Sequence, residues 1–173
     1  MSIYKIPLQE NVSDASAERI DWTLNNFSRV CVSFSGGKDS TVMLHLVAQQ
    51  ARQLKRKIDV IFLDWEAQFS STIQHVDTMR TLYRDVIHQF WWVALPLTTQ
   101  NALSQFQPEW QCWEPGTNWV RQPPEDAITD YHYFDFYQQG MTFEVFVREF
   151  AEWYAQKRPA AVIVGIRADE SYN

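Results

Sequence analysis

The sequence feature that most constrains this chain is a glycine turn placed between an apolar strand and a helix. The turn reads Ser-Gly-Gly-Lys-Asp-Ser at residues 35–40, after the apolar run 30–34 and before the amphipathic stretch 41–46. Glycine lets the backbone turn sharply and come close to a ligand. Successive N–H groups of such a turn, with the N-terminus of the following helix, form a concavity that binds anions. The string therefore predicts a phosphate-binding loop.

The side chains of the turn strengthen this interpretation. Ser35 and Ser40 can donate hydroxyl hydrogen bonds, and Lys38 supplies a point charge. Asp39 fits an anion site only if it caps the helix or faces a divalent cation. The alternative is an ordinary strand-to-helix turn, which needs glycine but not the other four residues. The string matches neither the Walker loop nor the G-x-G-x-x-G dinucleotide fingerprint.

Strands and helices are expected to alternate along most of the chain. Apolar and turn patterns predict helices over 11–27, 39–54, 70–88 and 142–157, and strands over 29–34, 58–63, 90–95 and 160–164. Strand–helix–strand units of this length require crossovers and give a parallel sheet. We therefore expect an α/β fold with a doubly wound parallel sheet in three layers, α/β/α.

We expect residues 1–173 to form a single domain with an aromatic and proline-rich insertion at about 96–137. No internal repeat and no second domain is visible in the sequence. A long irregular segment in a compact domain is usually functional or faces a partner. Eight Trp in 173 residues is unusual, and the Trp-rich segment 106–119 is a candidate surface for a protein partner.

The net charge and the cysteine content argue against several classes of function. The formal net charge of −6 argues against non-specific nucleic-acid binding, which is mainly electrostatic. Two cysteines make neither a disulfide framework nor a zinc site, and we expect structural roles for Cys31 and Cys112. No signal peptide opens the chain and no apolar run reaches the length of a membrane span, so the expected compartment is the cytoplasm without a membrane partner.

Two carboxylates follow the strand predicted at 58–63. Asp64 and Glu66 should lie at the ligand-binding edge of a parallel sheet, next to the glycine loop. They could hold a Mg²⁺ ion that bridges ATP phosphates, or one could bind ribose hydroxyls. The alternative is that Asp64 only caps a turn.

A second informative string follows the last predicted strand and reads Gly-Ile-Arg-Ala-Asp-Glu-Ser at 165–171. The Arg167 guanidinium has the fork geometry for phosphate or sulfate oxygens. Ser171 can donate to an anion, and Glu170 can orient Arg167 or meet a metal. The alternative is a surface salt bridge after a strand.

The glycine string resembles the pyrophosphate-binding loop of the ATP pyrophosphatases, the adenine nucleotide alpha-hydrolase-like (PP-loop) superfamily. The Gly-x-Arg-x-x-Glu-Ser string resembles phosphoadenosine phosphosulfate (PAPS) reductase-type domains. Within these, residues 63–68, 104–113 and 165–171 are similar to regulators of the immunoglobulin-binding regulator A type, which continue well past residue 173. The chain is therefore expected to be either a truncated segment or a natural short form.

The resemblance implies a Rossmann-like sheet, an adenine nucleotide as ligand, and ATP with Mg²⁺ as cofactors. Lys38, Asp39 and Arg167 are the predicted catalytic residues, and Asp39 and Asp64 the predicted metal ligands. The predicted nucleotide-binding residues are Ser33, Ser35, Gly36, Gly37, Lys38, Asp39, Ser40, Asp64, Glu66, Gly165, Arg167, Glu170 and Ser171.

Three functions are compatible with these patterns. The first is cleavage of ATP between the α- and β-phosphates to adenylylate an unidentified acceptor, with sulfate as one candidate. The Glu-Cys-Gly-x-His string of the thiol-dependent sulfonucleotide reductases is absent from the given sequence, which argues against that reaction. The second is a nucleotide-sensing regulator that acts through a protein partner without turnover. The third is a component of a nucleic-acid sulfur-modification system, which the negative charge disfavours.

Overall fold

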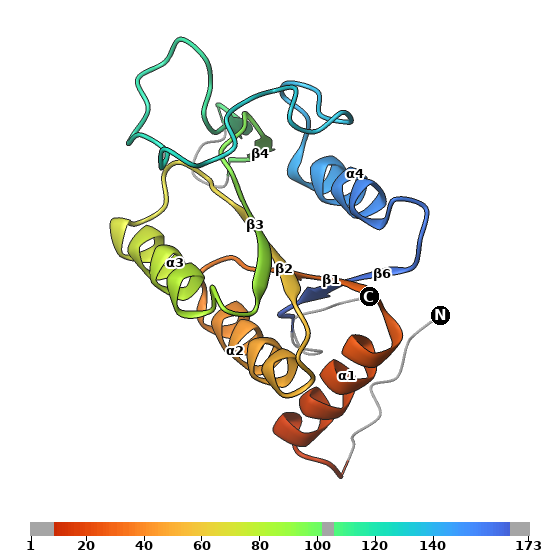
Figure 1. Ribbon diagram of the computed structural model, residues 1–173. Coiled ribbons are helices and arrows are strands. Elements are labelled where there is room, and N and C mark those ends of the chain that lie inside the picture. The colour runs from red at the N-terminus through yellow and green to blue at the C-terminus, as the bar shows by residue number, and fades with distance from the viewer. Residues whose placement is uncertain (1–8, 102–105, 167–173) are drawn as a thin grey trace.

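A four-stranded parallel sheet forms the centre of the molecule. The computed structural model describes residues 9–101 and 106–166 (Figure 1). The strands lie in the order β3-β2-β1-β6, and every neighbouring pair is parallel. Their bounds are β1 Arg29–Ser33, β2 Ile58–Leu63, β3 Ile87–Val93 and β6 Ala160–Val164. The predicted parallel α/β sheet is confirmed.

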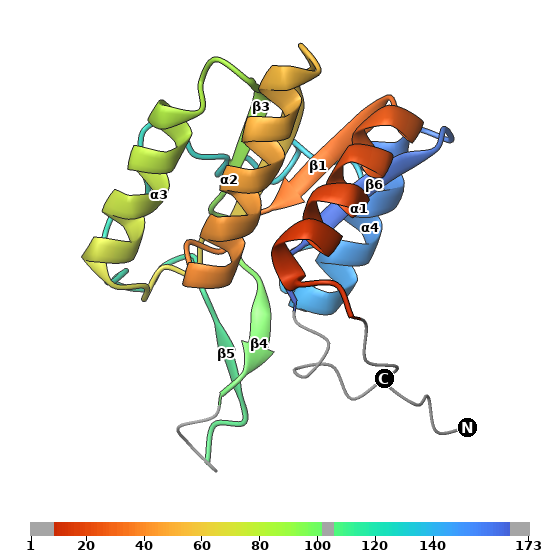
Figure 2. The same ribbon diagram turned by 90° about the horizontal axis from the view of Figure 1, so that it is seen from below.

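Helices cover both faces of this sheet and complete the three predicted layers. Figures 1 and 2 show α1, α2 and α3 on one face and α4 on the other. The bounds are α1 Val12–Asn26, α2 Lys38–Gln53, α3 Ser70–Leu82 and α4 Phe143–Ala155. Among the described helices, none is both long enough and apolar enough to cross a membrane.

Side chains that alternate along the strands supply two separate cores. On the face of α2, the fully buried Val32 and Val60 pack with Leu44 and Val47. On the opposite face, Cys31 belongs to a cluster that includes the aromatic rings of α4. Because neighbouring strand residues point to opposite faces, each strand stabilises both layers of helices.

Local signals start the helices close to the expected positions. Asn11 is the N-cap of α1, and its side chain accepts a hydrogen bond from the Asp14 N–H. Thr142 caps α4 by accepting from the Val145 N–H. Both residues satisfy one of the backbone donors that every helix start leaves unpaired.

The expected extent of α3 is wrong. The prediction carried this helix to about residue 88, but it ends at Leu82 and β3 already begins at Ile87. The chain turns at Tyr83, whose carbonyl accepts from the N–H groups of Val86 and Ile87. Apolar residues at 86 and 87 suit a helix stripe and a strand equally well, and pairing of Ile87 with Ile58 in the sheet decides between them.

The segment expected to be irregular contains regular structure. Two short strands, β4 Thr98–Gln100 and β5 Glu109–Gln111, form an antiparallel pair. Much of the aromatic content of this segment is buried in the core on the α4 side of the sheet, since Trp113 is 1% exposed and Phe134 is also buried. The Trp-rich segment 106–119 is therefore partly core, although Phe106 is fully exposed.

Candidate functional site

The glycine loop lies where the strand order of the sheet changes direction. From β1 the chain proceeds outward through β2 and β3, and it returns to the other side of β1 with β6. The loop at 35–40 follows β1, and Gly165 follows β6. In open parallel sheets this position leaves a crevice outside the carboxyl ends of the strands, where ligands bind.

Gly36 and Gly165 allow close backbone approaches around the loop. Gly36 has φ +76°, and a Cβ there would lie 2.9 Å from the Cγ2 atoms of both Thr72 and Val76. A Cβ on Gly165 would lie 3.2 Å from the backbone N and Cα of Ser40. The start of α2 is thus held between α3 and the end of β6.

Helix α2 begins inside the loop without a capping side chain. Gly37 is its N-cap, and no side chain makes a capping hydrogen bond. Asp39, for which capping the helix was one of two expected roles, lies in its first turn instead. The N–H groups of that turn retain the partial positive charge of the helix terminus, which suits an anionic ligand.

The two loop serines bond to the loop itself. The Ser40 hydroxyl donates to the Gly37 carbonyl (3.1 Å) and accepts from the Ser35 N–H (3.2 Å). Ser35 Oγ lies 2.9 Å from Ser40 Oγ and accepts from the Gly37 N–H at 3.3 Å. These bonds shape the loop, and the phosphate contact expected for both hydroxyls stays a prediction.

Lys38 and Asp39 form an ion pair at the surface. Lys38 Nζ lies 2.7 Å from Asp39 Oδ2, and the two side chains are 78% and 38% exposed. Exposed pairs of this kind contribute little to stability. Exchange of the Asp39 contact for a phosphate contact would therefore cost the fold little.

Two further residues support the loop and were not predicted from the sequence. Thr41 Oγ1 donates to the Gly37 carbonyl (2.8 Å) and lies 2.9 Å from His75 Nε2 of α3. The Thr41 hydroxyl has a single proton, so it can donate to only one of these two atoms at a time. No sequence motif marks this pair, because only the packing of α3 on α2 brings it together.

Asp64 is buried, and both of its carboxylate oxygens are engaged within the protein. Oδ1 accepts from the Glu66 N–H (2.9 Å) and pairs with Arg121 Nη2, and Oδ2 accepts from Trp92 Nε1 at 2.7 Å. The Asp64 side chain is 0% exposed. In this arrangement the carboxylate is closed to a magnesium ion, so its role as a metal ligand stays a prediction that requires Arg121 to move.

Glu66 connects the end of β2 to residues 113–120 by two hydrogen bonds. Its Oε2 accepts from the Trp113 N–H (2.6 Å) and its Oε1 from the Val120 N–H (2.9 Å). The Trp113 indole donates in turn to the Asp64 carbonyl at 2.6 Å. We call the contacts of Asp64 and Glu66 with residues 113–121 the strand-end clasp. The clasp places the aromatic segment over the sheet edge that also carries the glycine loop.

Arg121, which belongs to the clasp, has side-chain nitrogen atoms without a hydrogen-bond partner. Its Nε and Nη1 atoms are buried and have no hydrogen-bond partner, and its guanidinium lies 5.2 Å from the centre of the Trp113 ring. Sequence reasoning missed Arg121 because 57 residues separate it from Asp64 and the intervening strands are short.

Neither cysteine is placed for nucleophilic chemistry. Burial, with the neighbouring Asp64 and Glu66 carboxylates, raises the pKa of the Cys112 thiol to about 12. Burial also raises the pKa of Cys31 far above its ordinary value. Both thiols therefore stay protonated at neutral pH, which agrees with the structural roles expected for them.

Of the remaining predicted site residues, the structure describes only Ser33. Ser33 ends β1 in register with Ile61 and Val164. Arg167, Glu170 and Ser171 lie outside the described residues. Among those described, no group of three or more His, Cys, Asp or Glu side chains could hold a metal ion.

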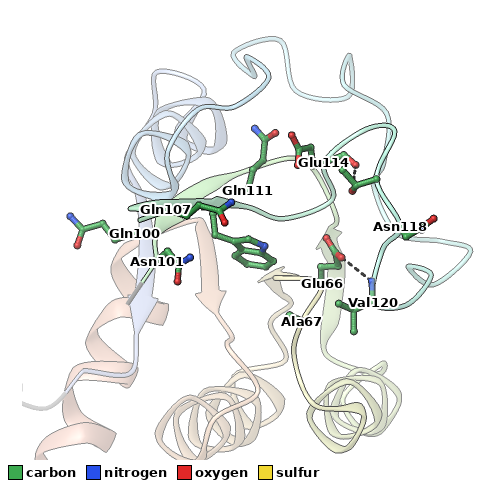
Figure 3. A pocket seen from close by; sticks show the side chains of 11 residues that line it. Glu66, Ala67, Gln100, Asn101, Gln107, Gln111, Glu114, Asn118 and Val120 are labelled. Carbon is green, nitrogen blue, oxygen red and sulfur yellow. Dashed lines mark hydrogen bonds between the residues drawn. The ribbon is translucent and has the colours of Figure 1, made fainter. Parts of the chain in front are cut away.

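An open pocket adjoins the clasp on the side of the β4–β5 pair. Figure 3 shows it between Glu66 at the end of β2, Gln111 on β5 and Asn118 in the following loop. The pocket has a volume of about 660 Å³, which is in the usual range for small-molecule sites. Sequence reasoning did not identify this pocket, because its side chains come from three separate segments.

The chain is similar to a known protein family, to a relative in sequence and to a solved structure. The family model described as the phosphoadenosine phosphosulfate reductase domain matches residues 29–173. Over 173 residues the chain is 71% identical to an uncharacterized protein, YbdN, of Escherichia coli (strain K12), and it spans 43% of that relative's length. The NH3-dependent NAD synthetase from Campylobacter jejuni subsp. jejuni NCTC 11168, solved in complex with the nitrate ion, is similar at a TM-score of 0.36 and 14% identity. That likeness covers 45% of this chain and 33% of the synthetase.

Proposed function

Because the chain belongs to the phosphoadenosine phosphosulfate reductase domain family, we propose that it binds ATP at the 35–40 loop and transfers the adenylyl group to an acceptor. The observation that carries the proposal is the uncapped start of α2 at the point where the strand order changes direction. Backbone N–H groups at such a position bind phosphate. Lys38 is exposed beside them and adds a positive charge.

In the proposed reaction an oxygen or nitrogen atom of the acceptor forms a bond to the α-phosphorus of ATP. The bond from that phosphorus to the oxygen bridging to the β-phosphate breaks, and its electron pair leaves with pyrophosphate. The proton of the acceptor passes to solvent. The loop N–H groups and Lys38 would stabilise the charge on the departing pyrophosphate, so positioning and charge neutralisation supply the catalysis.

Magnesium would neutralise phosphate charge when it is bound with the nucleotide. Of the two predicted ligands, Asp39 is the more exposed, because its side chain is 38% exposed in the first turn of α2 and pairs there with Lys38. Asp64 would first have to leave Arg121. We propose that Arg167 faces the α-phosphate or the acceptor, as its position after β6 suggests.

Release of pyrophosphate tests this function. Purified protein with Mg·ATP and candidate acceptors should release pyrophosphate, and Lys38→Ala should lower the rate by at least about a hundredfold, the usual effect of removing one stabilising donor. Lys55→Ala, at an exposed lysine beyond the other end of α2, is the matched control and should keep the rate. Release of orthophosphate alone would contradict cleavage between the α- and β-phosphates.

A regulator that binds nucleotide without turnover is the second candidate. The buried state of Asp64 favours it, because a carboxylate held by Arg121 and Trp92 is not available to assist chemistry. Calorimetry that shows ATP binding, together with no product after hours of incubation, would support this candidate over adenylyl transfer.

A further inference from the structure

Lysine and arginine side chains gather at the amino edge of the sheet, which is the edge opposite the glycine loop. We use the name amino edge for residues 27–29, 52–59, 83–88 and 155–160, which lead into the four strands. Figure 2 shows these connections together at the top of the view, with β4 and β5 at the bottom. The amino edge holds eight of the 15 Lys and Arg residues of the chain but only two of its 21 Asp and Glu residues. The eight are Arg29, Arg52, Lys55, Arg56, Lys57, Arg84, Lys157 and Arg158.

Side-chain contacts join the four connections into one surface. Arg56 Nη2 donates to two carbonyls of the α1–β1 connection, at 2.8 and 2.9 Å. Lys57 Nζ donates to the Asp85 carbonyl at 2.6 Å and so links the α2–β2 and α3–β3 connections. The Arg29 guanidinium at the start of β1 lies 4.4 Å from the centre of the Tyr154 ring at the end of α4. The basic side chains therefore belong to one continuous side of the molecule.

The negative charges of the amino edge are too few to balance its cations. Asp85 accepts two hydrogen bonds from Arg52, each 2.7 Å long, and Asp59 accepts from the Tyr154 hydroxyl at 2.8 Å. The next carboxylate along the chain is the exposed Glu152, in the last turn of α4. Four helices end at this edge, and each C-terminus carries about half a negative charge. An excess of positive charge remains, although the formal net charge of the whole chain is −6.

Four cations of the amino edge are available to a partner. Lys55, Arg84, Lys157 and Arg158 are exposed, and their side chains form no hydrogen bond or ion pair with another described residue. They extend over the connections into β2, β3 and β6, and β3 and β6 are the outer strands of the sheet. Three strand spacings separate these two strands by about 14 Å. This width is close to that of the major groove of DNA, about 12 Å, so the cations can meet phosphates on both sides of a groove.

The amino edge, all of whose residues the structure describes, has no exposed large apolar side chain. It therefore has nothing to insert below the headgroups of a lipid surface. It also has no exposed aromatic ring on which unpaired bases could stack, as proteins that bind single strands provide. Phosphate contacts from Lys and Arg hold a duplex without reading its bases. The composition of the surface thus fits the backbone of a duplex better than a membrane or a single strand.

We propose that the amino edge binds the sugar–phosphate backbone of double-stranded DNA without sequence preference. The four unpaired cations make the phosphate contacts. This proposal is independent of adenylyl transfer, because the glycine loop lies at the opposite edge of the sheet. It departs from the expectation drawn from the net charge of the chain. Net charge averages over the whole surface, whereas a polyanion responds to the potential of the face that it meets.

Fluorescence anisotropy of a short labelled DNA duplex tests the proposal. Titrations are made at several salt concentrations between about 50 and 200 mM. The duplex should bind with a Kd of about 1–100 µM at physiological salt, the usual range for binding without sequence preference. Four phosphate contacts should give a slope of about −3.6 for log K against log salt. A duplex of unrelated sequence should bind equally well.

Substitution of single unpaired cations locates the binding surface. Arg84→Gln and Arg158→Gln should each weaken binding by about threefold to tenfold and reduce the salt slope by about 1. The double variant should reduce the slope by about 2. Arg19→Gln, at an exposed arginine in the middle of α1, is the matched control and should keep both affinity and slope. All these side chains are exposed, so the circular dichroism spectrum should stay that of the parent.

Four results would overturn the proposal. The first is absence of duplex binding at the lowest salt concentration. The second is an equal loss of affinity in Arg19→Gln and in the variants of the amino edge, which would show a general attraction. The third is tighter binding of a single-stranded oligonucleotide of the same length. The fourth is binding to vesicles of phosphatidylserine and phosphatidylcholine but not to the duplex, which would assign this face to a membrane surface.

Discussion

Gly36 and Gly37 are adjacent, yet the structure requires glycine at only one of them. Gly36 has φ +76° and no room for a Cβ between Thr72 and Val76. We expect Gly36→Ala to lower the free energy of unfolding by about 2 kcal/mol or more, from backbone strain and overpacking. Chemical denaturation followed by circular dichroism measures this change.

The neighbouring substitution Gly37→Ala is the matched control. At Gly37 φ is −79°, and a Cβ would meet only Ser35 Oγ at 3.4 Å. Alanine is a poorer N-cap than glycine, so a loss within about 1 kcal/mol is expected. Equal losses for the two variants would show that the contact with α3 does not explain the glycine at 36.

For single residues, the sequence predicted the glycine loop but not the side chains of Thr41 and His75 that support it. The spacing of glycines between an apolar run and a helix is a local pattern, and it gave the position of the turn correctly. Thr41 and His75, whose polar atoms lie 2.9 Å apart, belong to two helices. Contacts of this kind depend on how helices pack and leave no pattern along the chain.

Among the ion pairs of the described residues, the Arg121–Asp64 pair of the strand-end clasp is the most buried. Arg121 pairs with Asp64, whose side chain is 0% exposed. We expect Arg121→Met to lower the free energy of unfolding by about 3 kcal/mol, because it leaves a buried carboxylate without its ion pair. Thermal or chemical denaturation at neutral pH measures the loss.

An exposed ion pair between an arginine and a carboxylate serves as the comparison. Arg148 pairs with Glu149, and their side chains are 66% and 32% exposed. Arg148→Met should cost less than about 1 kcal/mol. In the Arg121→Met background, Asp64→Asn should recover part of the stability, because the amide removes the buried charge. A small and equal effect of both arginine substitutions would show that the clasp does not hold the segment.

Element prediction succeeded where the signal was local and failed where it was not. Strands 58–63 and 160–164 were predicted with their observed bounds, because short apolar runs with turns at both ends are distinctive. The end of α3 was wrong because its last residues suit a helix and a strand equally. The β4–β5 pair was missed because two three-residue strands carry too few residues to show a period.

In the molecule as a whole, one sheet supplies two cores, and this bears on the prediction of a single domain. Val47 packs on the face of α2 and Phe150 on the face of α4, and both are almost fully buried. Since Cys31 and Val32 are adjacent on β1 and belong to opposite cores, loss of one face would uncover the strands of the other. We therefore expect the two faces to unfold together.

Truncation of a core residue on each face tests this cooperativity. Val47→Ala should cost about 2 kcal/mol and Phe150→Ala about 3–5 kcal/mol, and each should shift the circular dichroism and tryptophan fluorescence transitions by the same amount. Val42→Ala, on the same helix as Val47 but 58% exposed, should stay within about 0.5 kcal/mol of the parent. If Phe150→Ala instead separates the two transitions, the face built from the 96–137 segment and α4 folds as an independent unit. The glycine loop would then belong to the half that remains folded, because α2 and the Val32 side of β1 lie in the other core.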